Sequence, residues 1–329
     1  MSDVCLFMSS ENDAGELRLM SKASSLYYLQ GYNQREIADR LHLSRPKVSR
    51  LLQRARDRNI VQISVTSPEG NFVDLETEFE ERFDLEEMVI TFSGLSDTNG
   101  DAAFLKRQIG AAAANYLQRT VEEGDVLGIT WGTTLQAMMQ ALPPLDTEDV
   151  HVVQTLGGVG PPEAEAHAAD LSRRLAQLLD GRLTALPTPG IVDDPQVRDV
   201  LVSDRHAQAA LELFSELTTA FVGIGALSTN PIFEEDPAVS QQTYDDLVAS
   251  EAVGDIALRF FDSDGQTVHS SLDDRLIGIT LEQLNDTDLV VGVAGGPQKV
   301  DAIRGALRGR LVDVLITDHA TATRIAENF

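Results

Sequence analysis

The sequence predicts an α/β protein in which a small all-α helix-turn-helix domain precedes a larger, doubly wound domain with a mostly parallel sheet. Two short helical segments with capping residues lie together in one basic block, 34–58. From Phe72 onward, helical patterns alternate with short apolar strands, as expected when helices cover both faces of a parallel sheet. The net charge also changes sign, from +6 over residues 16–58 to −29 over residues 59–329.

The charge contrast limits where nucleic acid can bind. The formal net charge of the chain is −26, and an acidic surface is repelled by phosphates, because basic side chains supply most of the affinity for DNA. Only the basic block can therefore face a duplex. The acidity of the remainder suits either a host with high internal salt or a GC-rich genome, and it bears on solubility rather than on fold.

Four segments are expected along the chain. Residues 1–15 are polar and aperiodic, which predicts a disordered tail. Residues 16–58 make the helix-turn-helix domain. An alternating strand at 60–65 and the turn residues after it predict a connecting segment over 59–70. Residues 71–329 are long enough for one large domain with a full hydrophobic core.

Composition excludes several classes of protein. Cys5 is the only cysteine, so an intramolecular disulfide or a cysteine-rich zinc site is excluded. Apolar runs such as 289–294 are far shorter than the roughly 20 residues that span a membrane, and no targeting segment precedes them. We therefore expect a cytoplasmic protein without membrane contact. The six histidines lack metal-ligand spacing and no P-loop occurs, so we expect no metal and no cofactor.

Three helices are predicted in the basic domain. Apolar residues at steps of three and four predict a first helix that Gly31 ends; its stripe is Leu17, Met20, Ala23, Ser24, Tyr27 and Tyr28. Asn33 is a suitable N-cap for a second helix, with Glu36 at the third helical position. After a turn at His42 and Leu43, Ser44 can cap a third helix, which buries Val48, Leu51, Leu52 and Ala55.

The third helix has the pattern of a recognition helix. Its buried stripe leaves polar and basic side chains to point outward, where they can enter a major groove or hold phosphates. The predicted contacts to double-stranded DNA are Gln34, Arg35, Ser44, Arg45, Lys47, Ser49, Arg50 and Arg54. A solvated basic face is the alternative, and the two capped helices with their short turn favour DNA binding.

Helices and buried strands alternate through the large domain. Helical patterns occur at 72–83, 102–121, 164–179, 207–217, 244–250 and 298–307, with a further helix starting near Leu135. Strand candidates occur at 88–92, 126–129, 151–156, 183–186, 219–224, 289–294 and 314–317. Ligands of such sheets bind outside the carboxyl ends of the strands.

Glycines and small hydroxyl side chains follow several of these strands. Gly132, Thr133 and Thr134 lie between the strand at 126–129 and the next helix, where backbone N–H groups, hydroxyls and the helix dipole favour an anion such as phosphate. The alternative is that a threonine only caps the helix. Other strands end at Gly157 and Gly158, at Gly223 and Gly225, and at Gly295, Gly296 and Lys299. Lys299 is either an anion ligand or an ordinary surface lysine.

Carboxylates also occur near apolar segments at 254–265. Asp255 is suited to bind sugar hydroxyls, whereas Asp264 and Gly265 have the sequence of a hairpin turn. Paired carboxylates also serve acid–base chemistry in enzymes, so this segment alone does not separate a binding site from a catalytic one.

The chain resembles the SorC family of bacterial transcriptional regulators, which combine a helix-turn-helix with a C-terminal sugar-binding domain. The likeness is carried by YNQREIADRLHLSRPKVSRLL at 32–52, GDVLGITWGTTL at 124–135, LPTPGIV at 186–192, VGDIALRFFDSDG at 253–265 and VVGVAGGPQKVDAIRGALRGRLVDVLITDHATA at 290–322. These motifs span nearly the whole chain in the expected order.

The resemblance implies a fold like that of sugar-phosphate isomerases and deaminases, without catalysis. It implies that Gly132, Thr133 and Thr134 bind an effector phosphate, that Gly295, Gly296 and Lys299 close the other side, and that Asp255 and Gln154 contact hydroxyls. The strand before Gly157 and Gly158 has no lysine, so a Schiff base is not expected there. The implied partners are operator DNA, a sugar or sugar phosphate, and a second copy in a homodimer or homotetramer.

Two other functions are compatible with the large domain. It resembles the fold of phosphosugar isomerases and deaminases, so an enzyme would use the same cleft; the recognition helix argues against this, because such chemistry does not need it. A DNA-tethered interaction module with an empty cleft would not be stabilised by any sugar phosphate.

Overall fold

The computed structural model describes residues 15–58, 60–61, 72–92, 102–159, 162–236 and 238–327. The chain divides into two compact units, Met1–Thr66 and Ser67–Phe329, which we call the N-terminal unit and the effector unit. The expected tail at 1–15 lies outside the described residues except for Gly15, which already belongs to the first helix. Most of the expected connecting segment, 59–70, also lies outside them.

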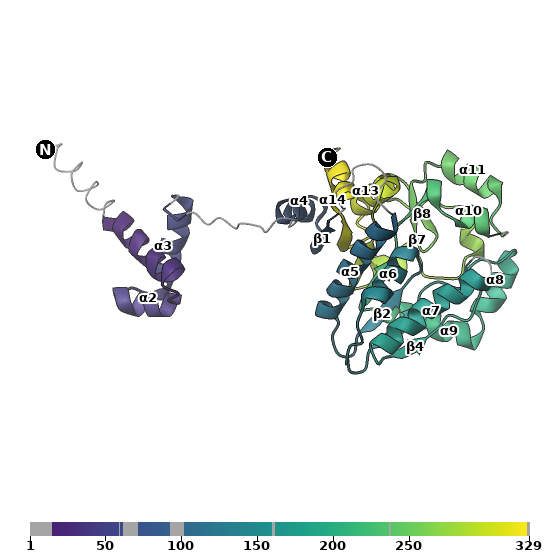
Figure 1. Cartoon of the computed structure of the whole chain (residues 1–329), viewed down its shortest axis with the longest axis horizontal. Coiled ribbons are helices and arrows are strands. Elements are labelled where there is room, and N and C mark those ends of the chain that lie inside the picture. Colours follow the sequence, from purple (N-terminus) through teal and green to yellow (C-terminus); the bar gives the residue numbers. More distant parts are fainter. Residues whose placement is uncertain are drawn as a thin grey trace. The chain divides into compact units, whose positions relative to one another are not determined.

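The N-terminal unit is a compact group of three helices (Figure 1). The first covers 15–24 and continues into one π-helical turn, η1 (Ser25–Leu29). The other two are α2 (Gln34–Leu41) and α3 (Arg45–Asp57). Val48, Leu51, Leu52 and Ala55 of α3 are buried as predicted, and they pack with Met20, Ala23, Leu26, Ile37 and Ala38.

The π-helical turn changes which side chains of the first helix are buried. Its signature is the bond from the Gln30 N–H to the Ser25 carbonyl, five residues back, which places one extra residue in the turn. Leu26 therefore enters the core at 4% exposure, while Tyr27 keeps 37% of its surface exposed. The predicted stripe is wrong at Leu17, Tyr27 and Tyr28, which are exposed.

The turn between α2 and α3 forms as the sequence indicates. The Asn33 side chain accepts hydrogen bonds from the N–H groups of Arg35 and Glu36, each at 3.0 Å, and the Glu36 carboxylate accepts one from the Asn33 N–H at 2.8 Å. His42 adopts the left-handed conformation that ends α2, with φ of 52°. Ser44 occupies the N-cap position of α3, but its hydroxyl makes no capping bond.

The strand predicted at 60–65 is not supported by its two described residues. The N–H groups of Ile60 and Val61 both donate to the Ala55 carbonyl, at 2.8 and 3.1 Å, and both side chains pack near Met20 and Leu51. They therefore terminate α3 instead of starting a strand, and residues 62–65 lie outside the described part of the chain.

A seven-stranded parallel sheet forms the centre of the effector unit. Its order is β1-β10-β9-β5-β2-β3-β4, and all six pairings are parallel. All seven predicted strands are present, with ends that differ by at most two residues. They are β1 (Glu87–Thr91), β2 (Val126–Ile129), β3 (His151–Gln154), β4 (Arg182–Thr184), β5 (Thr219–Val222), β9 (Leu289–Val293) and β10 (Val314–Asp318).

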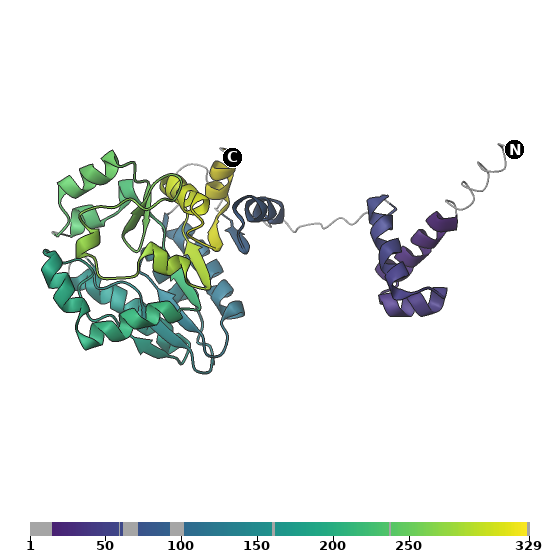
Figure 2. The ribbon, with the colours of Figure 1, turned by 180° about the vertical axis from the view of Figure 1, so that it is seen from behind.

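Helices cover both faces of this sheet, which confirms the predicted α/β class. One hydrophobic core packs α5 (Ala102–Thr120), α6 (Thr133–Ala141) and α7 (Pro162–Leu178) on one face. The other core packs α4 (Val73–Phe83), α9 (Arg205–Glu212), α12 (Leu281–Asn285), α13 (Val300–Arg308) and α14 (His319–Ala326) on the opposite face. Figure 1 shows α5 and α6 side by side, and Figure 2 shows the unit from behind.

A small antiparallel sheet was not predicted. It consists of β6 (Gly225–Ala226), β7 (Gly254–Ile256) and β8 (Arg259–Phe261), in the order β6-β7-β8. Strands of two or three residues are too short for alternation to be visible. The helices α8 (Pro195–Val202), α10 (Ile232–Glu235), α12 and α14 were also not predicted. The helix α11 (Gln241–Ala249) lies near the small sheet (Figure 1).

A third hydrophobic core connects the small sheet to the large one. It includes Leu156 from beyond β3, Leu258 and Phe260 of the β7–β8 hairpin, and Leu247 of α11. Trp131, the only tryptophan of the chain, follows β2 and packs against both this core and the core of the α5–α7 face. None of the helices in the described ranges is long and apolar enough to cross a membrane.

The two caps of the helix-turn-helix predict unequal effects of mutation. We expect Asn33→Ala to destabilise α2 by about 1 kcal/mol, because it removes the two hydrogen bonds that the side chain accepts. Ser44→Ala is the matched control and should cost much less, because that hydroxyl makes no capping bond. Amide hydrogen exchange of α2 and α3 in the full-length protein measures both effects, and equal destabilisation by the two variants would contradict the observed capping.

Candidate functional site

The predicted ligand site lies where the chain changes direction across the sheet. β2 leads through α6 to β3 on one side, whereas β5 pairs with β2 on the other. Such a switch point opens a crevice at the carboxyl ends of the two strands. The ends are tied together here: the Thr130 N–H donates to the Phe221 carbonyl at 3.1 Å, and the Gly223 N–H donates to the Thr130 hydroxyl at 3.2 Å.

Asp255 is buried beside the loop that follows β5. Gly225 pairs with Asp255 across β6 and β7, and a Cβ at Gly225 would overlap the Asp255 carboxylate, so only glycine fits there. Asp255 is 6% exposed and accepts hydrogen bonds from Asn230 Nδ2 at 2.8 Å and the Leu258 N–H at 3.1 Å. Burial raises the pKa of this carboxyl, although both hydrogen bonds and Lys299 favour the charged form.

Lys299 reaches the same loop from the other side. It belongs to η5 (Pro297–Lys299), which follows β9, and its Nζ donates to the Ile224 carbonyl at 2.6 Å. Burial lowers the pKa of this lysine, the charge of Asp255 raises it, and the charge of Lys106 lowers it further. Lys299 is therefore not an ordinary surface lysine. It is a largely desolvated cation whose neighbours include a second cation.

Lys106 is a residue that sequence reasoning missed. It lies in the second turn of α5, far from Lys299 in sequence, yet close enough for its charge to oppose that of Lys299. These are the only two lysines of the effector unit, since Lys22 and Lys47 belong to the N-terminal unit. Lys106 is exposed, and its charge has the smallest of the three effects on the pKa of Lys299. Two like charges near each other favour a bound anion, which relieves their repulsion. Only the packing of α5 against the loop after β9 brings them together.

The glycines after β9 form a fixed turn between these elements. The Gly296 N–H donates to Asp318 Oδ2 at 2.9 Å and to the Thr321 hydroxyl at 2.8 Å. The added Cβ of an alanine at Gly295 would approach both Asp318 Oδ2 and Ile109 Cδ1 at 2.5 Å. Asp318 also caps α14 through the Thr321 N–H. The turn therefore shapes the site, while the Gly296 N–H is already bonded within the protein.

The N-terminus of α6 opens at the same edge of the sheet. Its N-cap is Gly132, with φ of 140°, so Thr133 and Thr134 are the first two helical residues and neither is the cap. The alternative in which a threonine only caps the helix is therefore wrong. Thr133 is exposed and Thr134 is buried. Without a capping side chain, the first N–H groups and the positive end of the dipole face the carboxyl edge of β2.

The residues after β3 have mainly structural contacts. Gln154 is buried, its Nε2 donates to the Leu156 carbonyl at 2.7 Å, and its Oε1 accepts the Leu186 N–H at 3.4 Å. Gly157 lies against Pro189 and Gly190, and the Gly158 N–H donates to the Thr188 carbonyl at 2.9 Å. The polar groups of these three residues are therefore bonded to backbone.

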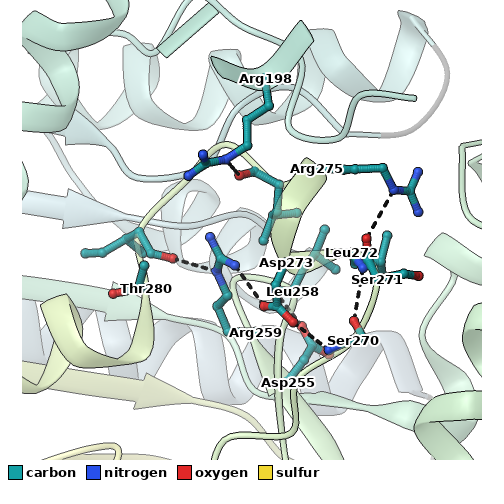
Figure 3. Close-up of polar contacts among 12 residues, drawn as sticks. Arg198, Asp255, Leu258, Arg259, Ser270, Ser271, Leu272, Asp273, Arg275 and Thr280 are labelled. Atoms are coloured by element: carbon teal, nitrogen blue, oxygen red, sulfur yellow. Dashed lines mark hydrogen bonds and ion pairs between the residues drawn. The ribbon is translucent and has the colours of Figure 1, made fainter. Parts of the chain in front are cut away.

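A buried ion pair holds the hairpin that carries Asp255 (Figure 3). Arg259 Nη1 lies 2.8 Å from Asp273 Oδ1, and Arg259 Nε donates to the Ile279 carbonyl at 3.3 Å. Asp273 in turn accepts the Ser270 N–H at 2.7 Å. Residues 262–265 form the expected turn, with φ of 75° at Gly265.

The predicted DNA-contacting residues differ in their freedom to bind. Arg35, Ser44, Arg45, Lys47, Ser49 and Arg50 are exposed, and Gln34 is partly buried. Arg50 Nε donates only to the Pro46 carbonyl of its own helix, at 3.3 Å. Arg54 instead forms an ion pair with Glu16 of the first helix, so its charge is partly compensated within the protein. The free basic groups therefore lie at the amino end of α3.

Comparisons with known proteins agree with this arrangement. The sugar-binding domain family matches residues 67–327, and region 4 of sigma-70 matches residues 25–58. The deoxyribonucleoside regulator of Bacillus subtilis strain 168 is 33% identical over 96% of this chain and 99% of its own length. The sorbitol operon regulator of Klebsiella pneumoniae is 29% identical over 94% of this chain and 98% of its own length.

A solved structure extends the likeness to the whole fold. The crystal structure of the full-length sorbitol operon regulator SorC from Klebsiella pneumoniae matches with a TM-score of 0.71 and 29% identity, over 94% of this chain and 98% of the other. The helix-turn-helix, the parallel sheet and these matches lead to one conclusion. The chain belongs to the SorC family of transcriptional regulators, which bind DNA through a helix-turn-helix and carry a sugar-binding domain.

Proposed function

We propose that this regulator binds operator DNA through α3 and that a phosphorylated sugar, bound at the switch point between β2 and β5, controls that binding. Gly132, Thr133, Thr134, Lys106 and Lys299 would hold the phosphate, and Asp255 a hydroxyl. We further propose a cytoplasmic homodimer or homotetramer without catalytic activity, in which paired N-terminal units contact two half-sites. Effector binding would favour one of two states of the protein.

One observation carries this proposal more than any other. Lys299 is largely buried and donates to the Ile224 carbonyl at the carboxyl edge of the parallel sheet, where α6 also begins, within a unit that is strongly acidic overall. A phosphate would make charge-assisted contacts with the ammonium of Lys299 and, through its charge, favour that of Lys106. The names of two relatives, a deoxyribonucleoside regulator and a sorbitol operon regulator, agree with a sugar-derived effector.

A ligand screen tests the effector site. We expect a phosphorylated sugar, and not its free form, to raise the thermal midpoint and change the fluorescence of Trp131; saturation at 100 times Kd corresponds to about 2.7 kcal/mol of added stability. Lys299→Ala and Thr133→Ala should lose most of the shift, whereas Lys22→Ala, a lysine of the N-terminal unit, should keep it. Equal shifts in all four proteins would exclude the site, and turnover of the sugar would favour an isomerase or deaminase.

The lowered pKa of Lys299 predicts a pH dependence of effector binding. Burial lowers this pKa, so the ammonium loses its proton at a pH where an ordinary lysine stays charged, and affinity for a phosphate falls as pH rises. The phosphate itself titrates near pH 6, so a loss of affinity above that range and below the ordinary lysine pKa of about 10.4 reports the lysine. Lys299→Arg keeps its charge throughout, and binding titrations should show no such loss. The same decline in both proteins would contradict the assignment.

Arg50→Ala tests the recognition helix. We expect affinity for a duplex selected from a random-sequence pool to fall by about 1–3 kcal/mol at fixed salt, because Arg50 is exposed on α3 and bonded only within its own helix. The effector-induced thermal shift should stay unchanged, because Arg50 and the effector site belong to different units, and amide hydrogen exchange of α2 and α3 checks that the N-terminal unit is folded. Unaltered affinity for the selected duplex, measured by fluorescence anisotropy, would contradict the role of α3.

A further inference from the structure

The exposed residues of the π-helical turn have no role in the core. The turn places Leu26 inside, while Tyr27, Tyr28 and Leu29 remain exposed. The rings of Tyr27 and Tyr28 meet edge to face, with centroids 4.9 Å apart. π-helical turns are uncommon and often mark functional sites. The turn therefore places Tyr27 at the surface, and packing of the core does not explain this position.

Tyr27 lines a notch that three elements of the N-terminal unit form together. The other residues of the notch are Asn33, Gln34, Arg35 and Arg45. Tyr27 comes from η1, the next three residues from the start of α2, and Arg45 from the first position of α3. The notch thus collects two guanidinium groups, a phenol hydroxyl and two primary amides from segments separated by up to eighteen positions in the sequence.

The charges in the notch are not compensated within the described part of the protein. Arg35 and Arg45 are exposed, and neither forms an ion pair with any described residue. Other arginines of the unit are engaged: Arg40 donates to the Tyr32 hydroxyl at 2.7 Å, and Arg54 pairs with Glu16. The nearest acid in sequence, Glu36, uses its carboxylate to accept the Asn33 N–H. An anion would find two free guanidinium groups here and no lining carboxylate.

We propose that this notch binds one backbone phosphate of the operator, with Tyr27, Arg35 and Arg45 as its donors. The inference rests on the proposed binding of DNA through α3. It assigns phosphate contacts and base contacts to different residues of that surface. Phosphate contacts fix the position of a protein on the duplex without carrying sequence information. The notch residues therefore set how α3 enters the groove, while Ser49 and Arg50 on the following turn read bases.

The phosphate role predicts different signatures for the tyrosine and the arginines. Tyr27→Phe removes a neutral donor and keeps the ring. It should lower the affinity for the selected duplex and for an unrelated duplex by the same factor, about 5- to 10-fold, and leave the salt dependence of binding unchanged. Arg35→Ala should weaken both duplexes equally and lower the slope of log K against log salt by about 0.9. Tyr28→Phe is the matched control, because Tyr28 does not line the notch, and it should bind like the wild type.

Neutral phosphate replacement supplies the decisive measurement. In the selected duplex, methylphosphonate groups replace single phosphates in turn, and full-length wild type, Tyr27→Phe, Tyr28→Phe and Arg35→Ala are titrated at fixed salt. Replacement of one phosphate per half-site should strongly weaken DNA binding by the wild type and by Tyr28→Phe. The same replacement should weaken DNA binding by Tyr27→Phe and Arg35→Ala much less. The effects of the notch mutation and the replacement are then not additive, as expected for groups in contact.

The results separate this inference from the proposed function. If Arg50→Ala weakens the selected duplex but Tyr27→Phe and Arg35→Ala leave both duplexes unaffected, the notch proposal is wrong and the recognition helix stands. If Tyr27→Phe weakens only the selected duplex, the tyrosine reads sequence, which also overturns the proposal. If Arg50→Ala leaves the affinity for the selected duplex unchanged, and the effects of the notch mutations and of phosphate replacement are additive, then neither the role of α3 nor the role of the notch is correct. The conservative Tyr27→Phe change keeps the ring that packs on Tyr28, so misfolding does not obscure the outcome.

Discussion

Parallel pairing of all seven strands is the constraint on which the effector unit depends. It requires every strand to end at the same edge of the sheet, and the reversal of strand order between β2 and β5 opens that edge at one place. Segments distant in sequence then meet without any local signal. Thr133 after β2, Ile224 after β5, Lys299 after β9 and Asp255 on the small sheet share one region for this reason.

The same region holds charges at a cost in stability. Removing an ammonium or a carboxylate from water is unfavourable unless a partner compensates for it. Asp255 has two hydrogen bonds from Asn230 and Leu258, and Lys299 has the Ile224 carbonyl, yet burial still shifts both pKa values toward the neutral forms. Buried charged groups gain more from a charged ligand than solvated groups do, because the ligand replaces the interactions with water that burial removed.

The sequence predicted what depends on local pattern. Apolar runs located all seven strands, and Asn33 with Glu36 identified the start of α2, because each signal lies within a few residues. The β6–β8 strands were missed because two or three residues carry no period. The nearness of Lys106 to Lys299 was missed because it depends on how α5 packs. The π-helical turn was missed because it changes the backbone hydrogen bonds and leaves the sequence spacing of the apolar residues at 17–28 as it is. Gly157 and Gly158 were correctly placed at a strand end, but their contacts with 188–190 depend on tertiary structure.

The two units impose one thermodynamic condition on regulation. The sugar-binding domain lies within 67–329 and the helix-turn-helix within 1–66, so a ligand of the first affects DNA affinity of the second only through states of the protein that differ in both properties. Tight binding alone changes nothing if the ligand has equal affinity for these states. Linkage makes the effect reciprocal: operator DNA must alter effector affinity by the factor by which the effector alters DNA affinity. The strength of control is therefore set by how much the affinity for the effector differs between states, and not by the number of contacts that the effector makes in one of them.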